Sequence, residues 1–68
     1  MRKILLGQVR RGRGVTQKQL AEAVGVSLYT VSDWERGRLG RAAFEDVVAA
    51  ARFLECTVWD LFRGDEED

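Results

Sequence analysis

The sequence has no histidine, no proline and a single cysteine. The scarcity of histidine and cysteine limits the kinds of catalytic and metal-binding site that the protein can form. Histidine is the commonest general acid–base in enzymes, so its absence leaves acid–base catalysis poorly supplied. Cys56 has no partner for an internal disulfide, and without histidine the chain lacks the ligand set of a zinc site. Because the neighbouring Glu55 opposes a reactive thiolate, we interpret Cys56 as a small core residue. We therefore expect no enzyme, no metal and no cofactor.

Long apolar segments are also lacking. The longest uninterrupted one, at residues 47–51, is far short of the roughly 20 residues that span a bilayer. The N-terminus does not carry the apolar stretch of a secretory signal. A chain of 68 residues forms one small domain, which depends on dense helical packing or on a partner chain. We expect a soluble, cytoplasmic protein that does not bind membranes.

The formal net charge of the chain is zero, but the basic and acidic residues are unevenly distributed along the sequence. Eleven basic residues balance eleven acidic ones, and the last four residues, 65–68, are all acidic. Without these four, eleven basic residues face seven acidic ones, and the first eighteen residues carry six cations and no acid. DNA-binding domains are usually basic, so the total argues against DNA whereas the distribution does not.

The charge pattern also suggests a boundary. We expect a single domain at residues 1–64, followed by a disordered acidic tail at residues 65–68. One interpretation gives the tail no function. The other is that it weakens nonspecific DNA binding through repulsion that salt screens beyond roughly 8 Å.

Apolar residues recur at spacings of three and four, which predicts an all-α fold. Thr16 forms a capping box with Gln19, and Ser27 and Thr57 mark two further helix starts. Glycines suited to helix ends follow three of the helical patterns, at Gly25, Gly37 and Gly64. The sequence predicts five helices, at residues 2–11, 17–24, 28–36, 42–54 and 58–63.

The second and third predicted helices are separated only by Gly25-Val26-Ser27. So short a connection makes the two helices cross at a large angle, and the small Ala21 at the crossing permits their close approach. This is the geometry of a helix-turn-helix, whose second helix enters the major groove of DNA. An ordinary helical hairpin explains the turn equally well, so the turn alone leaves both interpretations open.

A resemblance decides between them. The segment TQKQLAEAVGVS at residues 16–27, followed by Val31 and by WERG at residues 34–37, strongly resembles the Cro and phage-repressor (Xre) family of helix-turn-helix proteins. The resemblance continues through Phe53 and Leu54 to residue 62 and covers nearly the whole chain except the acidic tail. It implies a compact, lambda-repressor-like, five-helix domain that binds double-stranded DNA. Such proteins are usually dimers and most often transcriptional repressors or regulators.

The resemblance also implies roles for individual residues. Base edges would face Leu28, Tyr29 and Asp33 on the third helix. Arg10 and Glu35 match a pair that ties this helix to the first one by a bidentate bond, which is a structural role. Phosphates would be contacted by the following residues: Gln17, Lys18, Thr30, Arg38 and Arg41.

The base-facing residues depart from the family's common pattern. Leucine cannot hydrogen-bond a base, although Leu28 can pack against a thymine methyl group. Asp33 can accept a hydrogen bond from cytosine N4, yet its charge repels phosphates. The alternative is that Leu28 and Tyr29 are core or dimer residues. The sequence does not determine the operator.

The C-terminal segment carries more apolar surface than a short helix buries. We expect Leu61 and Phe62 in the core, whereas Trp59 lies on another face with Val58 beside it, which suggests a homodimer interface. Trp59 packed against the fourth helix is the alternative. Glu55 stands where this family commonly has glycine, which puts the geometry of the preceding turn in question.

These features give one leading hypothesis and two others. The leading hypothesis is a dimeric, sequence-specific DNA-binding regulator, most often a repressor, that inserts residues 28–36 into the major groove of a palindromic operator. A protein-interaction adapter would instead use Leu28, Tyr29 and Trp59 as an apolar surface. A DNA-binding antitoxin would pair with a separate small protein. No small-molecule ligand is predicted.

Overall fold

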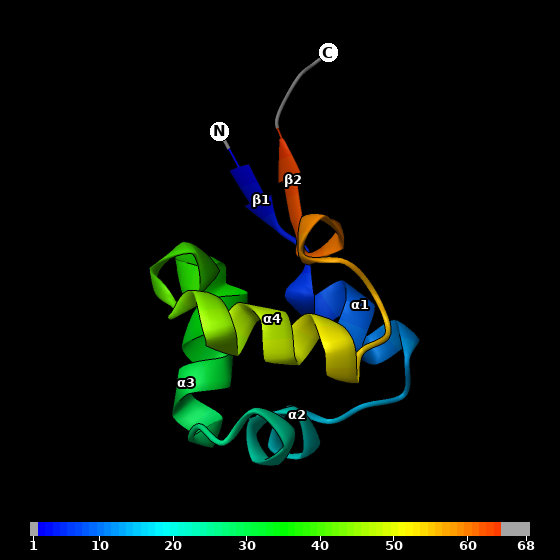
Figure 1. Cartoon of the computed structure of the whole chain (residues 1–68), viewed down its shortest axis with the longest axis vertical. Helices are drawn as coiled ribbons and strands as arrows, with labels where there is room; N and C mark the ends of the chain where they lie inside the picture. The colour runs from blue at the N-terminus through cyan, green and yellow to red at the C-terminus, as the bar shows by residue number, and fades with distance from the viewer. Residues whose placement is uncertain (1, 65–68) are drawn as a thin grey trace.

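A computed structural model describes residues 2–64 of the chain. Its α-helices are α1 (Leu6–Gly12), α2 (Gln17–Val24), α3 (Leu28–Asp33) and α4 (Phe44–Phe53). Figure 1 shows α2 and α3 at one end of the molecule and α4 lying across its middle. The predicted acidic tail at residues 65–68 lies outside the described residues.

Three short helical turns and two strands complete the fold. η1 (Trp34–Arg38) continues α3 as a wider, π-type turn that contains Gly37 at a φ of 120°, and the 3-10 turn η2 (Leu39–Arg41) follows. The 3-10 helix η3 (Val58–Leu61) leads into β2 (Phe62–Gly64). β2 pairs with β1 (Arg2–Ile4) in antiparallel register, so that Ile4 lies opposite Phe62, and the pair extends from the helical body (Figure 1).

The predicted helical class is confirmed, but the prediction was wrong at both ends. Residues 2–4 form β1 instead of the start of a helix, and the predicted helix at 58–63 is the short η3 followed by β2, which contains Gly64. Residues 2–64 therefore hold four α-helices, and not five. The physical reason is tertiary: each strand finds its partner at the opposite end of the chain, and Ile4 and Phe62 both pack against the core.

The predicted caps fix the helix starts. Thr16 Oγ1 accepts a hydrogen bond from the Gln19 N–H at 3.0 Å, and Gln19 Oε1 accepts one from the Thr16 N–H at 2.9 Å. Ser27 Oγ accepts from the Thr30 N–H at 3.1 Å. Thr57 forms a second complete capping box with Asp60. The hydrogen bonds from Thr57, first from its backbone N–H, lower the pKa of the Asp60 carboxyl below its ordinary value.

The core lies where α1, α2, α3 and α4 meet. Small residues permit this meeting, since Ala21 of α2 and Ala50 and Ala51 of α4 are all buried. Burial of each large aliphatic side chain stabilises the fold by about 1.5–3 kcal/mol. The largest fully buried side chains come from five elements and from the residue that ends α4: Leu6, Leu20, Val31, Leu39, Leu61 and Leu54.

The turn after α4 keeps a left-handed geometry although it contains no glycine. Glu55 adopts a φ of 59°, the conformation for which glycine is favoured. The carbonyl of Glu55 accepts a hydrogen bond from Arg13 Nη2 at 3.1 Å, which joins the end of α4 to the segment after α1. Glutamate therefore adopts at this position the backbone conformation that glycine favours.

Candidate nucleic-acid interface

The connection between α2 and α3 is a tight left-handed turn. Gly25 has a φ of 89° and a ψ of 31°, and its N–H donates to the Ala21 carbonyl at 2.8 Å. The Val26 N–H donates to the same carbonyl at 3.0 Å, so α2 ends and the chain changes direction within two residues. Ser27 then caps α3, and Val31 and Trp34 face the core. The buried side of α3 and η1 leaves the opposite side of α3 exposed.

The outward side of α3 forms a shallow surface depression of about 390 Å³. Tyr29 is 84% exposed and Leu28 45% exposed, so neither is a core residue. Arg36 was missed by the sequence analysis, although it follows Tyr29 by seven residues and Asp33 by three, which is the spacing of one helix face. The depression is lined by Tyr29, Thr30, Ser32, Asp33 and Arg36.

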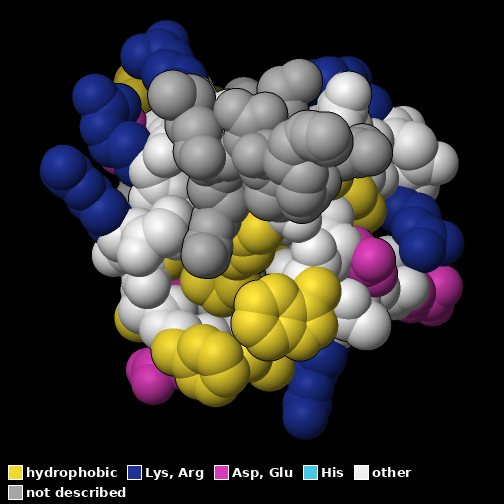
Figure 2. Space-filling view, turned by 90° about the horizontal axis from the view of Figure 1, so that it is seen from above, with side chains coloured by type: hydrophobic (Ala, Val, Ile, Leu, Met, Phe, Trp, Pro, Cys, Tyr) yellow, Lys and Arg dark blue, Asp and Glu magenta, His cyan; other side chains and the backbone are white. Residues whose placement is uncertain are grey.

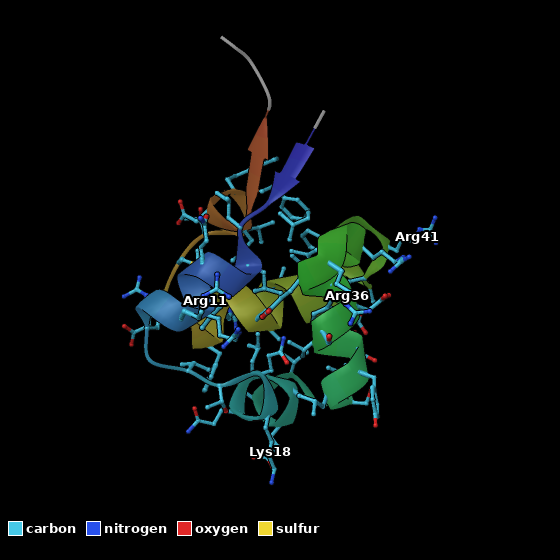
Figure 3. All side chains as sticks on the ribbon, turned by 180° about the vertical axis from the view of Figure 1, so that it is seen from behind. Arg11, Lys18, Arg36 and Arg41 are labelled. Atoms are coloured by element: carbon cyan, nitrogen blue, oxygen red, sulfur yellow. The ribbon has the colours of Figure 1, made fainter. Side chains whose placement is uncertain are left out.

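Figure 3 shows exposed cations on four elements, with Lys18 on α2 and Arg36 on η1, directly after α3. Lys18 and Arg41, both predicted to contact phosphates, are exposed on α2 and η2. Arg11 of α1 and Arg36 of η1 are exposed in the same view and were not singled out from the sequence. The excess of cations in the first eighteen residues could have identified Arg11 as a candidate DNA contact.

Two other residues that the resemblance assigns to DNA bond each other. Arg38 Nη1 donates to Asp33 Oδ1 at 2.6 Å, and the two side chains are 53% and 49% exposed respectively. Asp33 belongs to the depression on α3, whereas Arg38 lies at the end of η1. An ion pair between an acidic and a basic side chain therefore lies on the surface that the resemblance assigns to DNA contacts.

The side chains of Gln17 and Thr30 also have partners within the protein. Gln17 Nε2 donates to Glu35 Oε1 at 2.9 Å. The Thr30 hydroxyl is hydrogen-bonded to Ser27 Oγ at 2.9 Å. The backbone of Gln17 still occupies the N-terminus of α2, where N–H groups and the helix dipole favour an anion.

Glu35 of η1 joins α1 and α2 to the end of α3. Arg10 donates from Nε to Oε2 at 2.6 Å and from Nη2 to Oε1 at 3.2 Å, so the pair assigned by the resemblance is bidentate. The two side chains are 11% and 10% exposed, and Arg10 Nη1 also donates to the Val15 carbonyl at 2.9 Å. With Gln17, three donor groups converge on one buried carboxylate.

Gly7 makes room for this carboxylate. A Cβ at residue 7 would lie 3.2 Å from Glu35 Oε1 and 3.2 Å from Arg11 Nη1, which is closer than ordinary van der Waals contact. Gly7 is buried inside α1, where glycine weakens a helix by about 1 kcal/mol relative to alanine. The close contact with Glu35 of η1 explains why glycine occupies this position in the helix.

An apolar surface lies near the C-terminal turn. Trp59 is 78% exposed and Phe44 is 77% exposed, and Figure 2 shows hydrophobic side chains gathered on this end of the molecule. Val58 is half-buried and lines a hollow of about 310 Å³ together with Phe44 and Leu39. Apolar side chains from the start of α4 and from η3 are therefore left at the surface.

Cys56 packs against the core beside this region. Burial is the main cause that raises the pKa of the Cys56 thiol, and the negative charge of Asp60 adds to it. Residues 2–64 contain no group of three His, Cys, Asp or Glu side chains that could hold a metal ion. In the same range, no helix has the length and apolar character needed to cross a membrane.

The arrangement of α2, its glycine turn and α3 agrees with the protein family that the sequence matches. Residues 4–61 match the family described as the helix-turn-helix domain, so the chain belongs to that family, a class of DNA-binding domains. The chain is also similar to the HTH-type transcriptional activator BcrR of Enterococcus faecalis, with 38% identity over 61 residues. That alignment covers 90% of this chain and 29% of the relative, so the chain spans less than a third of the relative's length.

Proposed function

We propose that this chain is the sequence-specific DNA-binding unit of a transcription regulator of the Cro and phage-repressor (Xre) type. The observation that carries the proposal is the outward side of α3: it is exposed, it belongs to the second helix of a helix-turn-helix, and exposed cations of α1, α2, η1 and η2 are seen in the same view of the molecule (Figure 3). Phosphate contacts supply affinity and register, whereas base-edge contacts supply sequence choice.

In this mechanism α3 enters the major groove of double-stranded DNA. Tyr29 presents a ring and a hydroxyl to base edges, and Leu28 packs against a thymine methyl group. Arg36, at the far end of the same face, donates to a guanine or to a phosphate. Lys18 and Arg41 bind phosphates on either side of the groove, and the N–H groups at the start of α2 bind another.

We also propose that two copies bind together. Trp59 and Val58, with Phe44 beside them, would form the interface of a homodimer, because exposed aromatics are enriched at such interfaces. A two-fold dimer reads a palindromic operator whose half-sites lie about one helical turn apart. With roughly four to six phosphate contacts per subunit, affinity falls steeply as salt rises.

Repression is the proposed direction of regulation. Occupation of a promoter by the protein excludes polymerase without a further contact. The Enterococcus relative is named an activator, so a reporter gene with the operator placed over or upstream of the promoter distinguishes the two directions. Reduced expression from the overlapping arrangement supports repression, and increased expression from the upstream arrangement contradicts it.

Selection of bound duplexes from random DNA tests the function itself. We expect enrichment of a two-fold symmetric motif, with protection of two half-sites and an affinity that falls with salt. Arg36→Gln and Arg41→Gln should each weaken binding. Arg52→Gln, an equal loss of charge on α4, is the matched control and should leave affinity nearly unchanged. Enrichment of no sequence, or binding that does not depend on salt, contradicts the proposal.

The exposed aromatics favour one second candidate, the protein-interaction adapter. Tyr29 and Trp59 are both more than three-quarters exposed, as the anchors of a protein interface would be. An adapter keeps its function when Arg38 and Arg41 are reversed in charge and loses it on Tyr29→Ala. A DNA-binding regulator loses it on all three changes.

A further inference from the structure

The ion pair between Asp33 and Arg38 lies on the surface that would face DNA. Asp33 lines the depression on α3 next to Tyr29 and Arg36. Arg38 reaches back along the chain, so that its Nη1 lies 2.6 Å from Asp33 Oδ1. Both side chains are about half exposed, which leaves each of them accessible to a ligand.

The two partners have opposite relations to DNA. A phosphate attracts Arg38 and competes with Asp33 for its guanidinium, because both acceptors are anionic oxygens. The same phosphate repels Asp33, which gains in the major groove only where a donor such as cytosine N4 faces it. An exposed pair of this kind contributes about 0–1 kcal/mol, so it can be exchanged for other partners on binding.

We propose that this pair makes a phosphate contact of Arg38 conditional on the base that faces Asp33. The inference rests on the proposed function and concerns the same surface. Where cytosine N4 donates to Asp33 Oδ1, the oxygen that Arg38 occupies, the base competes with Arg38 and frees its guanidinium for the backbone. Where no donor faces Asp33, Arg38 divides between the carboxylate and the phosphate, and its phosphate contact adds little to affinity. Base recognition and backbone affinity are thereby coupled in one protein surface.

The first test uses a random-sequence duplex and needs no knowledge of the operator. Wild type, Asp33→Asn, Arg38→Gln and the double variant are compared by titration at several salt concentrations. We expect Arg38→Gln to change wild-type affinity little, but to weaken binding about two- to fivefold in the Asp33→Asn background. Asp33→Asn alone should tighten nonspecific binding and steepen the salt dependence by about one phosphate contact.

A matched control separates this pair from a general charge effect. Glu45→Gln removes one exposed carboxylate from the first turn of α4. We expect it to leave the effect of Arg38→Gln as in wild type. Urea unfolding of each variant verifies that it is folded. If Arg38→Gln weakens nonspecific binding by the same factor in wild type, Asp33→Asn and Glu45→Gln, the inference is wrong.

The second test uses the duplex recovered by selection. The inference expects a cytosine whose replacement weakens wild-type binding and also abolishes the effect of Arg38→Gln. Independent effects of the base change and of Arg38→Gln overturn it. These outcomes are distinct from failure of the proposed function, in which wild type binds no duplex in a salt-dependent way.

Discussion

At the scale of the residue, Glu35 anchors η1, the continuation of α3, to the rest of the protein. Its carboxylate accepts from Arg10 and Gln17 and lies against Gly7, so it connects η1 to α1 and α2. A buried pair of this kind adds little over a well-packed apolar pair, but loss of one partner leaves the other charged, buried and unsatisfied. The consequence is measurable by substitution.

We expect Glu35→Ala to lower the free energy of unfolding by about 3–5 kcal/mol, because Arg10 is left buried without an acceptor. Urea unfolding measures this loss. Asp33→Ala is the control, since it breaks an exposed pair with Arg38 and should cost about 0–1 kcal/mol. A loss within about 0.5 kcal/mol for Glu35→Ala would mean that the pair contributes no more than a surface one.

Gly7→Ala tests whether the space beside Glu35 is needed. Alanine is the better helix former, but its Cβ would displace the carboxylate, so we expect a loss of about 1 kcal/mol in unfolding free energy. In a Glu35→Ala background the same change should become stabilising. Gly12→Ala, whose Cβ meets nothing within 4 Å, serves as control and should stabilise by up to about 1 kcal/mol. Equal effects of the two substitutions in wild type would refute this explanation.

At the scale of the element, the helices are short and depend on their ends. The α-helical part of α3 has six residues, too few for a stable isolated helix, so its position comes from its cap and from the buried Val31 and Trp34. The wide turn of η1 then carries Glu35 towards α1 and Arg36 towards the exposed face. One turn thus supplies both an anchor and a candidate DNA contact.

The turn between α4 and η3 offers a test of backbone strain. Glu55 holds a left-handed φ of 59°, which costs about 1–2 kcal/mol for a residue with a Cβ. We expect Glu55→Gly to raise the free energy of unfolding by about 1 kcal/mol, because Arg13 bonds the backbone carbonyl, which glycine retains. Glu22→Gly, in the exposed face of α2, should instead lower it by about 1 kcal/mol. Urea midpoints compare the two, and destabilisation by Glu55→Gly would contradict the strain.

At the scale of the whole molecule, exposed cations and a cluster of hydrophobic side chains are both present on the surface. Figure 3 shows exposed cations on α1, α2, η1 and η2, and Figure 2 shows hydrophobic side chains gathered at the end of the molecule that carries η3, with cations around them. A zero net charge is therefore compatible with exposed cations near α3. The proposal assigns DNA to the outward side of α3 and a second copy to the surface of Phe44 and Trp59.

Sedimentation across a range of concentrations tests the proposed dimer. We expect Trp59→Ala and Phe44→Ala to weaken self-association by about tenfold or more, which is about 1.4 kcal/mol. Phe53→Ala removes an exposed aromatic from the opposite end of α4 to Phe44 and should have a smaller effect. A wild-type protein that remains monomeric at all concentrations would exclude this interface.

The sequence was sufficient for much of the local structure. Thr16, Ser27 and Thr57 predicted their helix starts because a capping hydrogen bond is made within four residues, and Gly25 predicted the turn for the same reason. The strands could not be predicted, because Ile4 pairs with Phe62 across nearly the whole chain. In the candidate site, the helical spacing from Tyr29 and Asp33 was enough to predict Arg36 on the same face. The hydrogen bond from Gln17 to Glu35 could not be predicted, because the two residues are far apart in the sequence.

What the sequence determined by itself was the helical class, the caps, the turn between α2 and α3, and the membership of a DNA-binding family, since each depends on residues close together or on a motif in fixed register. The tertiary structure decided the partners of the polar side chains. It placed Gly7, Arg10 and Gln17 around Glu35 and joined the two ends of the chain. These contacts depend on how the elements pack in three dimensions, which periodicity and capping patterns do not encode.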